Sequence, residues 1–265
     1  MIKLNDIEIP QNRFPDGTLL MKIKEYSEFP KNTITWLYEG DEELFTLVCL
    51  TRNLQDNGRT DIDLYMPYIP HARQDRVHDF RDVFTLKYFC EIINSLNFTT
   101  VKVLDAHSDV SAALLNRVDV INPWYIIIEA MRDIHDKDLV FYYPDAGAAK
   151  RYGGITNGSY AYGNKKRDWN TGEILGLEVV NAEIIKDKNV LIIDDICSKG
   201  GTFYHSAKAL KEAGAKDIYL YVSHCENTIL KGELLKDNGL IKKIYTTDSI
   251  FTEKHEKIVL VKENR

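Results

Sequence analysis

The sequence lacks the features that mark several large classes of protein. No apolar run approaches the 18 or more residues that a membrane span needs, and the start, Met1 to Asp6, lacks the apolar core of a signal peptide. The four cysteines contain no Cys-x-x-Cys pair, so neither a disulfide scaffold nor a zinc knuckle is indicated; they are Cys49, Cys90, Cys197 and Cys225. We therefore expect a cytoplasmic protein that does not bind a membrane.

An excess of positive charge is also absent. The chain has 34 Lys and Arg against 40 Asp and Glu, a formal charge of -6, which argues against a nucleic-acid partner. Any polyanion must then be held by a local cluster or a metal. Repeats, low-complexity tracts and Pro/Ser-rich linkers are missing too, whereas 44% apolar residues are ample for a core and exclude wholesale disorder. A length of 265 residues permits one large domain or two modest ones.

Short β-rich runs alternate with amphipathic helical patterns along the chain. This alternation predicts α/β architecture with parallel sheets, and two sheets fit better than one, with the break inside 121–138. We place the domains at 1–125 and 126–265. The expected strands are Ile34–Tyr38, Ile62–Met66, Val101–Leu104, Leu139–Tyr143, Val190–Ile193 and Ile218–Val222.

Ligands of open α/β sheets bind beyond the carboxyl ends of the strands, and four predicted strand ends carry reactive side chains. The most informative runs from Asp194 to Thr202, where two carboxylates precede a Gly-Gly-Thr turn that opens a helix. Free backbone N–H groups, close approach at the glycines and the positive helix end favour a phosphate there, while the carboxylates suit sugar hydroxyls or a metal. The alternative is that Asp194 and Asp195 cap the turn and the glycines only form a bend.

The stretch from Ala146 to Arg167 holds five basic residues and no acid. Its Gly, Tyr, Asn and Ser content predicts a mobile loop that closes over a transferring phosphoryl group and neutralises its charge. Taken alone, such a basic run is ordinary solvated charge.

Three further strand ends carry candidate ligands. His107 and Asp145 pair imidazole with carboxylate, a set that holds a divalent ion, although a lone histidine here is more often a hydrogen-bonded core residue. The run Arg73-Gln74-Asp75-Arg76 offers a planar cation and an amide for a nucleobase. Its alternative is a salt-bridge cluster before a helix.

Together these runs closely resemble the ribose-phosphate pyrophosphokinases, which are built from two type I phosphoribosyltransferase-like domains, each a mostly parallel sheet flanked by helices. Four segments resemble the family's ATP, metal and sugar motifs: Phe14-Pro15-Asp16-Gly17, Arg73-Gln74-Asp75-Arg76, Asp105-Ala106-His107 and Pro144-Asp145-Ala146-Gly147. Lys165-Lys166-Arg167 resembles the catalytic Lys-x-Arg, and Asp194 to Thr202 the sugar-phosphate loop.

The resemblance implies Mg²⁺-dependent transfer of a diphosphate from ATP to the anomeric hydroxyl of a 5-phosphorylated ribose, leaving AMP. It implies a homo-oligomer, because the segment with Phe14 and Asp16 reaches a neighbour's ATP site. Lys165 and Arg167 would be catalytic, and His107 and Asp145 would hold the metal. The implied ATP-binding residues are Phe14, Asp16, Arg73, Gln74, Asp75, Arg76 and His107. The implied ribose and 5-phosphate ligands are Asp145, Asp194, Asp195, Cys197, Ser198, Lys199, Gly200, Gly201 and Thr202.

Departures from the family pattern qualify the substrate. Ala148 replaces a glycine, and Ser198-Lys199 replaces the family's Asp-Thr, so a carboxylate is lost and a cation gained. That exchange suits a larger acceptor such as ADP-ribose, with Tyr152, Tyr160, Tyr162 and Trp169 either stacking an extra base or anchoring the loop. We favour ribose 5-phosphate and keep ADP-ribose as the alternative.

Other classes remain open on this fold. A phosphoribosyltransferase shares the Asp-Asp loop but does not need the Arg-Gln-Asp-Arg half. A non-catalytic family paralogue acting as a binding subunit would lack the Lys-x-Arg that is present here. A transcriptional regulator would call for a basic face or a DNA-reading element, and neither is visible.

Overall fold

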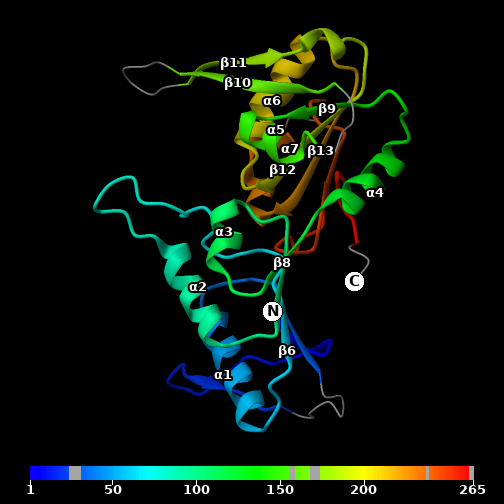
Figure 1. Ribbon diagram of the computed structural model, residues 1–265. Coiled ribbons are helices and arrows are strands. Elements are labelled where there is room, and N and C mark those ends of the chain that lie inside the picture. The colour runs from blue at the N-terminus through cyan, green and yellow to red at the C-terminus, as the bar shows by residue number, and fades with distance from the viewer. Residues whose placement is uncertain (24–30, 155–158, 168–173, 237–238, 263–265) are drawn as a thin grey trace. The chain divides into compact units, whose positions relative to one another are not determined.

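The computed structural model of the chain describes residues 1–23, 31–154, 159–167, 174–236 and 239–262 (Figure 1). Side chains are described over the same ranges except at 165–167 and 174–176. The chain divides into two compact units, Met1–Asn122 and Pro123–Arg265. The sequence placed the division between residues 125 and 126. Each unit is an α/β structure with its own sheet and its own hydrophobic core.

The first unit contains a six-stranded sheet in the order β2-β1-β5-β6-β7-β8. Strands β5 to β8 are parallel, and β1 and β2 are antiparallel additions at one edge. A separate hairpin joins β3 and β4. The strands are β1 (Ile2–Leu4), β2 (Ile7–Glu8), β3 (Asn12–Arg13), β4 (Leu19–Leu20), β5 (Asn32–Trp36), β6 (Ile62–Tyr65), β7 (Thr100–Leu104) and β8 (Val118–Ile121).

Three helices accompany this sheet: α1 (Glu43–Asp56), α2 (Thr85–Ser95) and α3 (Asp109–Leu114). Apolar residues at helical spacing, such as Leu47, Leu50 and Leu54 of α1, are completely buried in a core shared with β5 and β6. Figure 1 shows α1 and α2 alongside the strands, as this burial requires. The spacing of leucines therefore holds α1 on the sheet.

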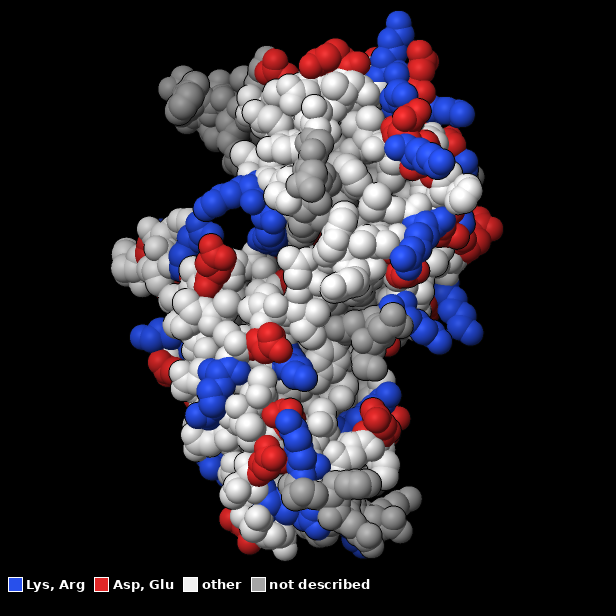
Figure 2. All heavy atoms as spheres, turned by 45° about the vertical axis from the view of Figure 1, so that its right-hand side comes forward, with Lys and Arg blue, Asp and Glu red and all other residues white. Residues whose placement is uncertain are grey.

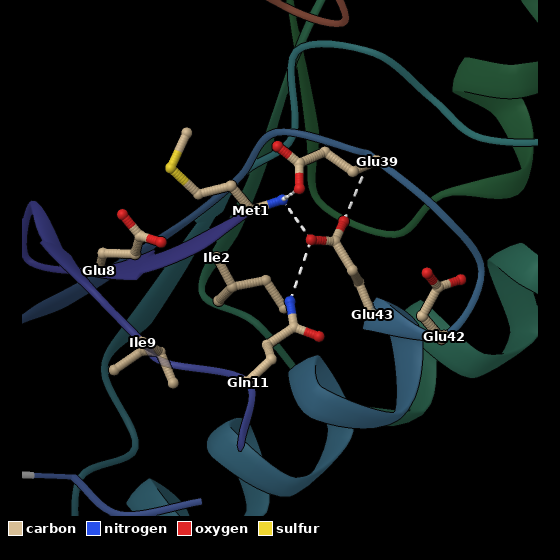
Figure 3. Close-up of a pocket in the computed structure, with 8 residues that line it drawn as sticks. All are labelled: Met1, Ile2, Glu8, Ile9, Gln11, Glu39, Glu42 and Glu43. Carbon is tan, nitrogen blue, oxygen red and sulfur yellow. Dashed lines mark hydrogen bonds and ion pairs between the residues drawn. The ribbon is translucent and has the colours of Figure 1, made fainter. Parts of the chain in front are cut away.

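A buried carboxylate ties the N-terminal strand to α1. Glu43 is 2% exposed, and its oxygens accept hydrogen bonds from Trp36 Nε1 at 2.8 Å and from the backbone N–H of Glu39 at 2.9 Å. Gln11 Nε2 donates to it at 3.0 Å, and the amino group of Met1 forms an ion pair with it. Figure 3 shows Met1, Gln11 and Glu39 converging on Glu43 at the edge of a pocket that Glu8 and Glu42 also line.

The second unit contains a seven-stranded sheet in the order β11-β10-β9-β12-β13-β14-β15. Only the β10–β11 pair is antiparallel, and it forms a long ribbon that extends from the sheet in Figure 1. The strands are β9 (Val140–Tyr143), β10 (Ala161–Arg167), β11 (Ile174–Val180), β12 (Val190–Cys197), β13 (Ile218–Cys225), β14 (Lys243–Thr246) and β15 (Ile258–Leu260).

The helices of the second unit are α4 (Trp124–Ile134), α5 (Ala146–Tyr152), α6 (Gly201–Glu212) and α7 (Glu233–Lys236), with short 3-10 turns η1 (Ala182–Ile184) and η2 (Asn227–Lys231). Phe203, Ala207 and Leu210 of α6 are buried against β12 and β13. Both central strands are almost wholly buried, which explains the apolar runs Val190–Ile193 and Ile218–Val222 with which they begin.

All six strands expected from the sequence are present, but the two central ones in the second unit are longer than expected. β12 continues from Ile193 to Cys197, and β13 from Val222 to Cys225. The two strands stay paired in parallel register as far as Cys197 and Cys225. Polar residues near a strand end do not stop a ladder, because backbone groups make its hydrogen bonds.

Two properties of the described residues bear on the partners expected above. None of the helices there is both long and apolar enough to cross a bilayer. On the face drawn in Figure 2, basic and acidic side chains are intermingled among uncharged residues. Local groups of charge therefore decide what binds to that face.

Candidate active site

The Asp-Asp pair lies inside strand β12, not in the loop that follows it. Asp195 is 5% exposed, and its backbone N–H donates to Asp194 Oδ1 at 3.0 Å. Adjacent residues of a strand point to opposite faces of the sheet. The strand therefore delivers one carboxylate to each face at its carboxyl end.

Each carboxylate of the pair has its own electrostatic setting. Arg151 Nη1 of α5 forms an ion pair with Asp195 Oδ2 at 3.0 Å. Burial raises the pKa of Asp194 well above its usual range, and repulsion from Asp195, and less strongly from Asp145, adds to the effect. Ionised Asp194 therefore lies in unfavourable surroundings that a nearby cation or hydroxyl donors would improve.

The turn after β12 has the geometry of an anion cradle. Gly200 has a φ of +79°, in the left-handed region, and helix α6 begins directly after it. Tyr204 N–H donates to Gly200 O at 2.8 Å, which starts the helix. Lys199, Gly201 and Thr202 are exposed at this end of α6. Backbone N–H groups and the positive end of the twelve-residue helix are thus available to an anion.

Cys197 and Ser198 differ in what they offer a ligand. The Cys197 side chain is 1% exposed within the core and lies beside Cys225 on the neighbouring strand. The hydrogen bond with Cys225, followed by burial, raises the pKa of the Cys197 thiol. The Ser198 hydroxyl donates to Glu226 Oε1 at 3.0 Å.

Asp145 caps helix α5. Its Oδ1 accepts hydrogen bonds from Gly147 N at 2.9 Å and from Ala148 N at 3.0 Å. Ala148 lies within the helix, where a left-handed conformation is not needed, so the glycine of the related motif can be replaced. The carboxylate is thereby held directly after β9, at the same sheet edge as the β12 end.

The expectation of a loop over Ala146 to Arg167 was wrong for most of its described part. Ala146–Tyr152 is helical because Asp145 caps a run rich in alanine, and Ala161–Arg167 is strand β10, paired with β9 and β11. The backbone of Lys165 and Arg167 lies in β10 opposite Leu177 and Ile174, and their side chains lie outside the described residues.

The aromatics near this stretch also separate. Tyr152 is 1% exposed and stacks on Tyr143 at 6.3 Å between ring centroids, so it is a core residue and does not present a face to a base. Tyr160 meets Tyr143 edge-on at 5.0 Å and Tyr162 at 6.4 Å, which anchors the start of β10. Trp169 lies outside the described residues.

In the first unit, the Arg-Gln-Asp-Arg run occupies the connection from β6 to α2. Arg73, Gln74 and Arg76 are exposed, whereas Asp75 is 5% exposed. Gln74 Oε1 accepts a hydrogen bond from Thr85 Oγ1, the first residue of α2, at 2.9 Å. Arg76 Nε binds Asp75 Oδ1 at 2.8 Å.

Asp75 links this run to the end of β7. The hydrogen bond from Arg76 lowers its pKa, and Ser108 and His107 lower it further, while burial opposes them. His107 is partly buried in the turn between Asp105, whose φ is 44°, and Ser108, which caps α3. The structure thus brings Asp75 together with His107 and Ser108, from which it is far apart in the sequence.

The segment with Phe14 and Asp16 forms the turn of the β3–β4 hairpin. Phe14 is 49% exposed, and Gly17 has a φ of +86° at the tip. Asp16 Oδ1 accepts from Thr18 N at 3.0 Å and Thr18 Oγ1 at 2.7 Å, and these bonds lower its pKa. The hairpin therefore presents an aromatic ring and a carboxylate to solvent.

Magnesium suits the residues at the β9 and β12 ends. It usually binds through one or two carboxylates and completes its shell with water and substrate phosphates. Asp145 and Asp194 are close enough for Asp145 to raise the pKa of Asp194, a repulsion that a cation would relieve. No group of three or more His, Cys, Asp or Glu with the arrangement needed to hold a metal ion occurs among the described residues, so an all-protein cage is not present in that part of the chain.

Two residues of the β12 surroundings, Glu226 and Gly232, were not expected from the sequence, and Arg151 was expected only as one of the five basic residues of Ala146 to Arg167. Arg151 contacts Asp195, and Glu226 contacts Ser198. Gly232 packs on the carbonyl of Lys199. Glu226 directly follows β13, so a search of strand ends would have found it had the strand been extended beyond Val222.

Comparisons with known proteins agree with this arrangement. Residues 157–255 match the phosphoribosyl transferase domain family. The ribose-phosphate pyrophosphokinase of Saccharolobus solfataricus is 26% identical over 250 residues, 92% of this chain and 85% of that protein. The ribose-phosphate pyrophosphokinase of Thermosipho africanus is 29% identical over 262 residues, 94% of this chain and 79% of that protein.

The crystal structure of phosphoribosylpyrophosphate synthetase from Mycobacterium smegmatis superposes with a TM-score of 0.77 at 18% identity, over 96% of this chain and 85% of that one. It confirms the fold class expected from the sequence, with phosphoribosyltransferase-like α/β architecture. The relatives bear the name of an enzyme that transfers a diphosphate. The predicted resemblance is thus confirmed, since the chain is similar to ribose-phosphate pyrophosphokinases over more than nine-tenths of its length.

Proposed function

We propose that the protein is a Mg²⁺-dependent enzyme that transfers the diphosphate of ATP to the anomeric hydroxyl of ribose 5-phosphate, giving phosphoribosyl pyrophosphate and AMP. The observation that carries the proposal is the β12–α6 connection. A strand-borne pair of carboxylates, Asp194 and Asp195, leads directly into a glycine turn and the N-terminus of a helix. Carboxylates suit the ribose hydroxyls and the helix end suits the 5-phosphate.

The roles of individual residues follow from that placement. Asp194 and Asp195 orient the ribose, with Arg151 fixing Asp195 through its ion pair. Backbone groups from Ser198 to Thr202 hold the 5-phosphate, with Lys199 exposed beside them. Asp145, just after the end of β9, would hold magnesium, which neutralises charge on the diphosphate when bound. His107, the other ligand expected from the sequence, belongs to the first unit.

ATP is assigned to the first unit. Arg73 and Gln74 are exposed on the β6–α2 connection and would contact adenine, while Asp75 holds Arg76 and the His107 turn. Phe14 and Asp16 on the exposed hairpin would reach the ATP of a neighbouring copy in a homo-oligomer. Lys165 and Arg167, on the β10 backbone, would stabilise the charge that develops on the transferred group.

A second acceptor, ADP-ribose, is favoured by one observation. Lys199 is exposed at the cradle, where the related loop carries no cation, and an added cation suits a more extended diphosphate. The aromatic argument for this acceptor is weaker, because Tyr152 is buried. A non-catalytic binding subunit is the remaining alternative.

One assay separates these possibilities. Purified protein is incubated with Mg-ATP and, in parallel, ribose 5-phosphate or ADP-ribose, and AMP is measured by chromatography. We expect AMP with ribose 5-phosphate. If AMP forms only with ADP-ribose, ADP-ribose is the acceptor. If AMP forms with neither acceptor, the result favours a non-catalytic binding subunit.

Lys199→Thr tests the origin of acceptor choice. If the lysine discriminates, the substitution improves use of ribose 5-phosphate relative to ADP-ribose. An unchanged ratio of kcat/KM values would remove Lys199 from the argument.

A further inference from the structure

The loop between β12 and α6 is fastened to the segment that follows β13. Glu226 N–H donates to Cys197 O at 2.8 Å, and Ser198 Oγ donates back to Glu226 Oε1 at 3.0 Å. Thr228 Oγ1 donates to the other carboxylate oxygen, Oε2, at 2.8 Å. Both oxygens of Glu226 therefore have a hydroxyl donor, and the side chain is held between the loop and its own segment.

Backbone packing reinforces this connection. A Cβ built at Gly232 would lie 1.9 Å from the carbonyl oxygen of Lys199, so the two backbones touch there. A Cβ at Gly200 would lie 3.0 Å from Leu234 Cδ2. The loop rests on the chain from Glu226 to Leu234 with no room for a larger residue at position 232.

The hydrogen bonds also determine what Ser198 offers to a ligand. A serine hydroxyl has a single hydrogen, and an ionised carboxylate can only accept. While Ser198 donates to Glu226, its hydroxyl has only lone pairs for any other group. A phosphate oxygen needs a donor, so the first side chain of the loop is not a phosphate ligand in this arrangement. A negative charge also lies one hydrogen bond away from it.

We propose that Glu226 is a specificity-determining positioning residue for the phosphorylated acceptor. It holds the loop so that backbone N–H groups, not Ser198, receive the phosphate, and its charge disfavours a concentrated dianion near Ser198. This proposal rests on the proposed function, since it concerns the acceptor of that reaction. Positioning of the loop raises the affinity for the acceptor, whereas repulsion between the Glu226 charge and the phosphate lowers it. Substitutions at position 226 separate these two effects.

Two variants at position 226 test the proposal, with Glu233→Gln as matched control. Glu233 is on the same segment but is exposed and pairs only locally, with Lys236 at 2.7 Å. E226Q keeps an acceptor for Ser198 and a polar partner for Thr228 but removes the charge. E226A removes both hydrogen bonds and the charge.

Initial rates of AMP formation are measured with acceptor varied at saturating Mg-ATP, and then with ATP varied. We expect E226A to raise the acceptor KM about tenfold or more, a loss of about 1.4 kcal/mol in binding, and to leave the ATP KM within about twofold. E226Q should lower the acceptor KM by roughly two- to fivefold, because a nearby charge of the same sign is gone. E233Q should match the unsubstituted protein. An unchanged acceptor KM in E226A, or a raised one in E226Q, overturns the proposal.

Amide hydrogen exchange provides a readout that does not depend on catalysis. Peptides covering 197–204 should exchange faster in E226A, without substrates, while E226Q and E233Q should retain slow exchange. Equal exchange in all variants refutes the fastening of the loop. If even the unsubstituted protein forms no AMP, the proposed function fails, and the exchange result still decides whether Glu226 holds the loop. Should E226A not fold, Thr228→Val removes one of the same hydrogen bonds and takes its place.

Discussion

Replacing Glu43 by alanine should strongly destabilise the first unit. The carboxylate is 2% exposed and accepts hydrogen bonds from Trp36 Nε1 and from the backbone N–H of Glu39, the second of which is drawn in Figure 3. Trp36 is itself 1% exposed, so its indole N–H would be left without an acceptor away from water. Gln11 loses its contact as well.

The magnitude follows from these groups. An unsatisfied buried donor costs about 1–3 kcal/mol, and hydrogen bonds to a charged group contribute about 1.5–3 kcal/mol each. These terms overlap, and water can enter beside the exposed Glu39, so we expect a loss of about 3–4 kcal/mol in the free energy of unfolding. With a urea m-value of about 2 kcal/mol/M, the midpoint should fall by roughly 1.5–2 M.

Trp36 fluorescence reports this transition when Trp124 and Trp169 are replaced by phenylalanine, which leaves one tryptophan in the chain. The control is Glu42→Ala, because Glu42 begins the same helix but is exposed, and its loss should change stability by less than about 0.5 kcal/mol. Glu43→Gln should fall between the two. If E43A costs less than about 1 kcal/mol, or no more than E42A, the carboxylate does not hold the first unit together as described.

Two further substitutions test the second unit. Asp194→Asn should stabilise the protein at neutral pH in EDTA-containing buffer. The pKa of Asp194 is raised in the folded state, so its protonated form stabilises the fold relative to its ionised form. This stabilisation is fully present below the usual pKa near 3.8 and is lost as pH rises through the folded-state pKa. Thermal unfolding should show the gap between the two proteins closing as pH falls, and a gap that does not depend on pH would contradict this. Gly163→Ala should cost about 1–3 kcal/mol, because the added Cβ would lie 2.5 Å from Pro144 O and 2.6 Å from the Tyr142 hydroxyl. Gly154→Ala, which meets nothing within 4 Å, should cost less than about 1 kcal/mol in the same urea titration.

The residues that sequence reasoning located well are those whose role depends on local order along the chain. Asp145 was expected at a strand end and lies just after β9, and the Gly-Gly-Thr turn expected to open a helix does so at α6, although the helix that Asp145 caps was expected to be a loop. The periodicity of Leu47, Leu50 and Leu54 is likewise local. Such features are readable because neighbouring residues determine them.

Contacts between distant segments were not readable in the same way. The sequence around Glu43 does not predict its hydrogen bond with Trp36, and the sequence around Asp195 does not predict its ion pair with Arg151. A charged residue at position 43, 151 or 195 is equally compatible with solvent exposure. Because the predicted strand ended at Val222, Glu226 was not recognised as a residue at a strand end. The apolar run ends at Val222, whereas β13 continues to Cys225. Backbone hydrogen bonds determine strand length, and the types of side chain along the strand do not indicate where those bonds end.

The contact between Gly232 and the Lys199 carbonyl bears on how phosphate loops can be moved between proteins. Grafting Ser198 to Thr202 onto another phosphoribosyltransferase-like scaffold transfers the motif but not the segment on which the loop packs. The smallest transplantable unit also includes Glu226 to Leu234, a second piece of chain that lies outside the motif. The conformation of the loop therefore depends on two separate stretches of sequence. Substitutions in one stretch restrict which residues the other can accept.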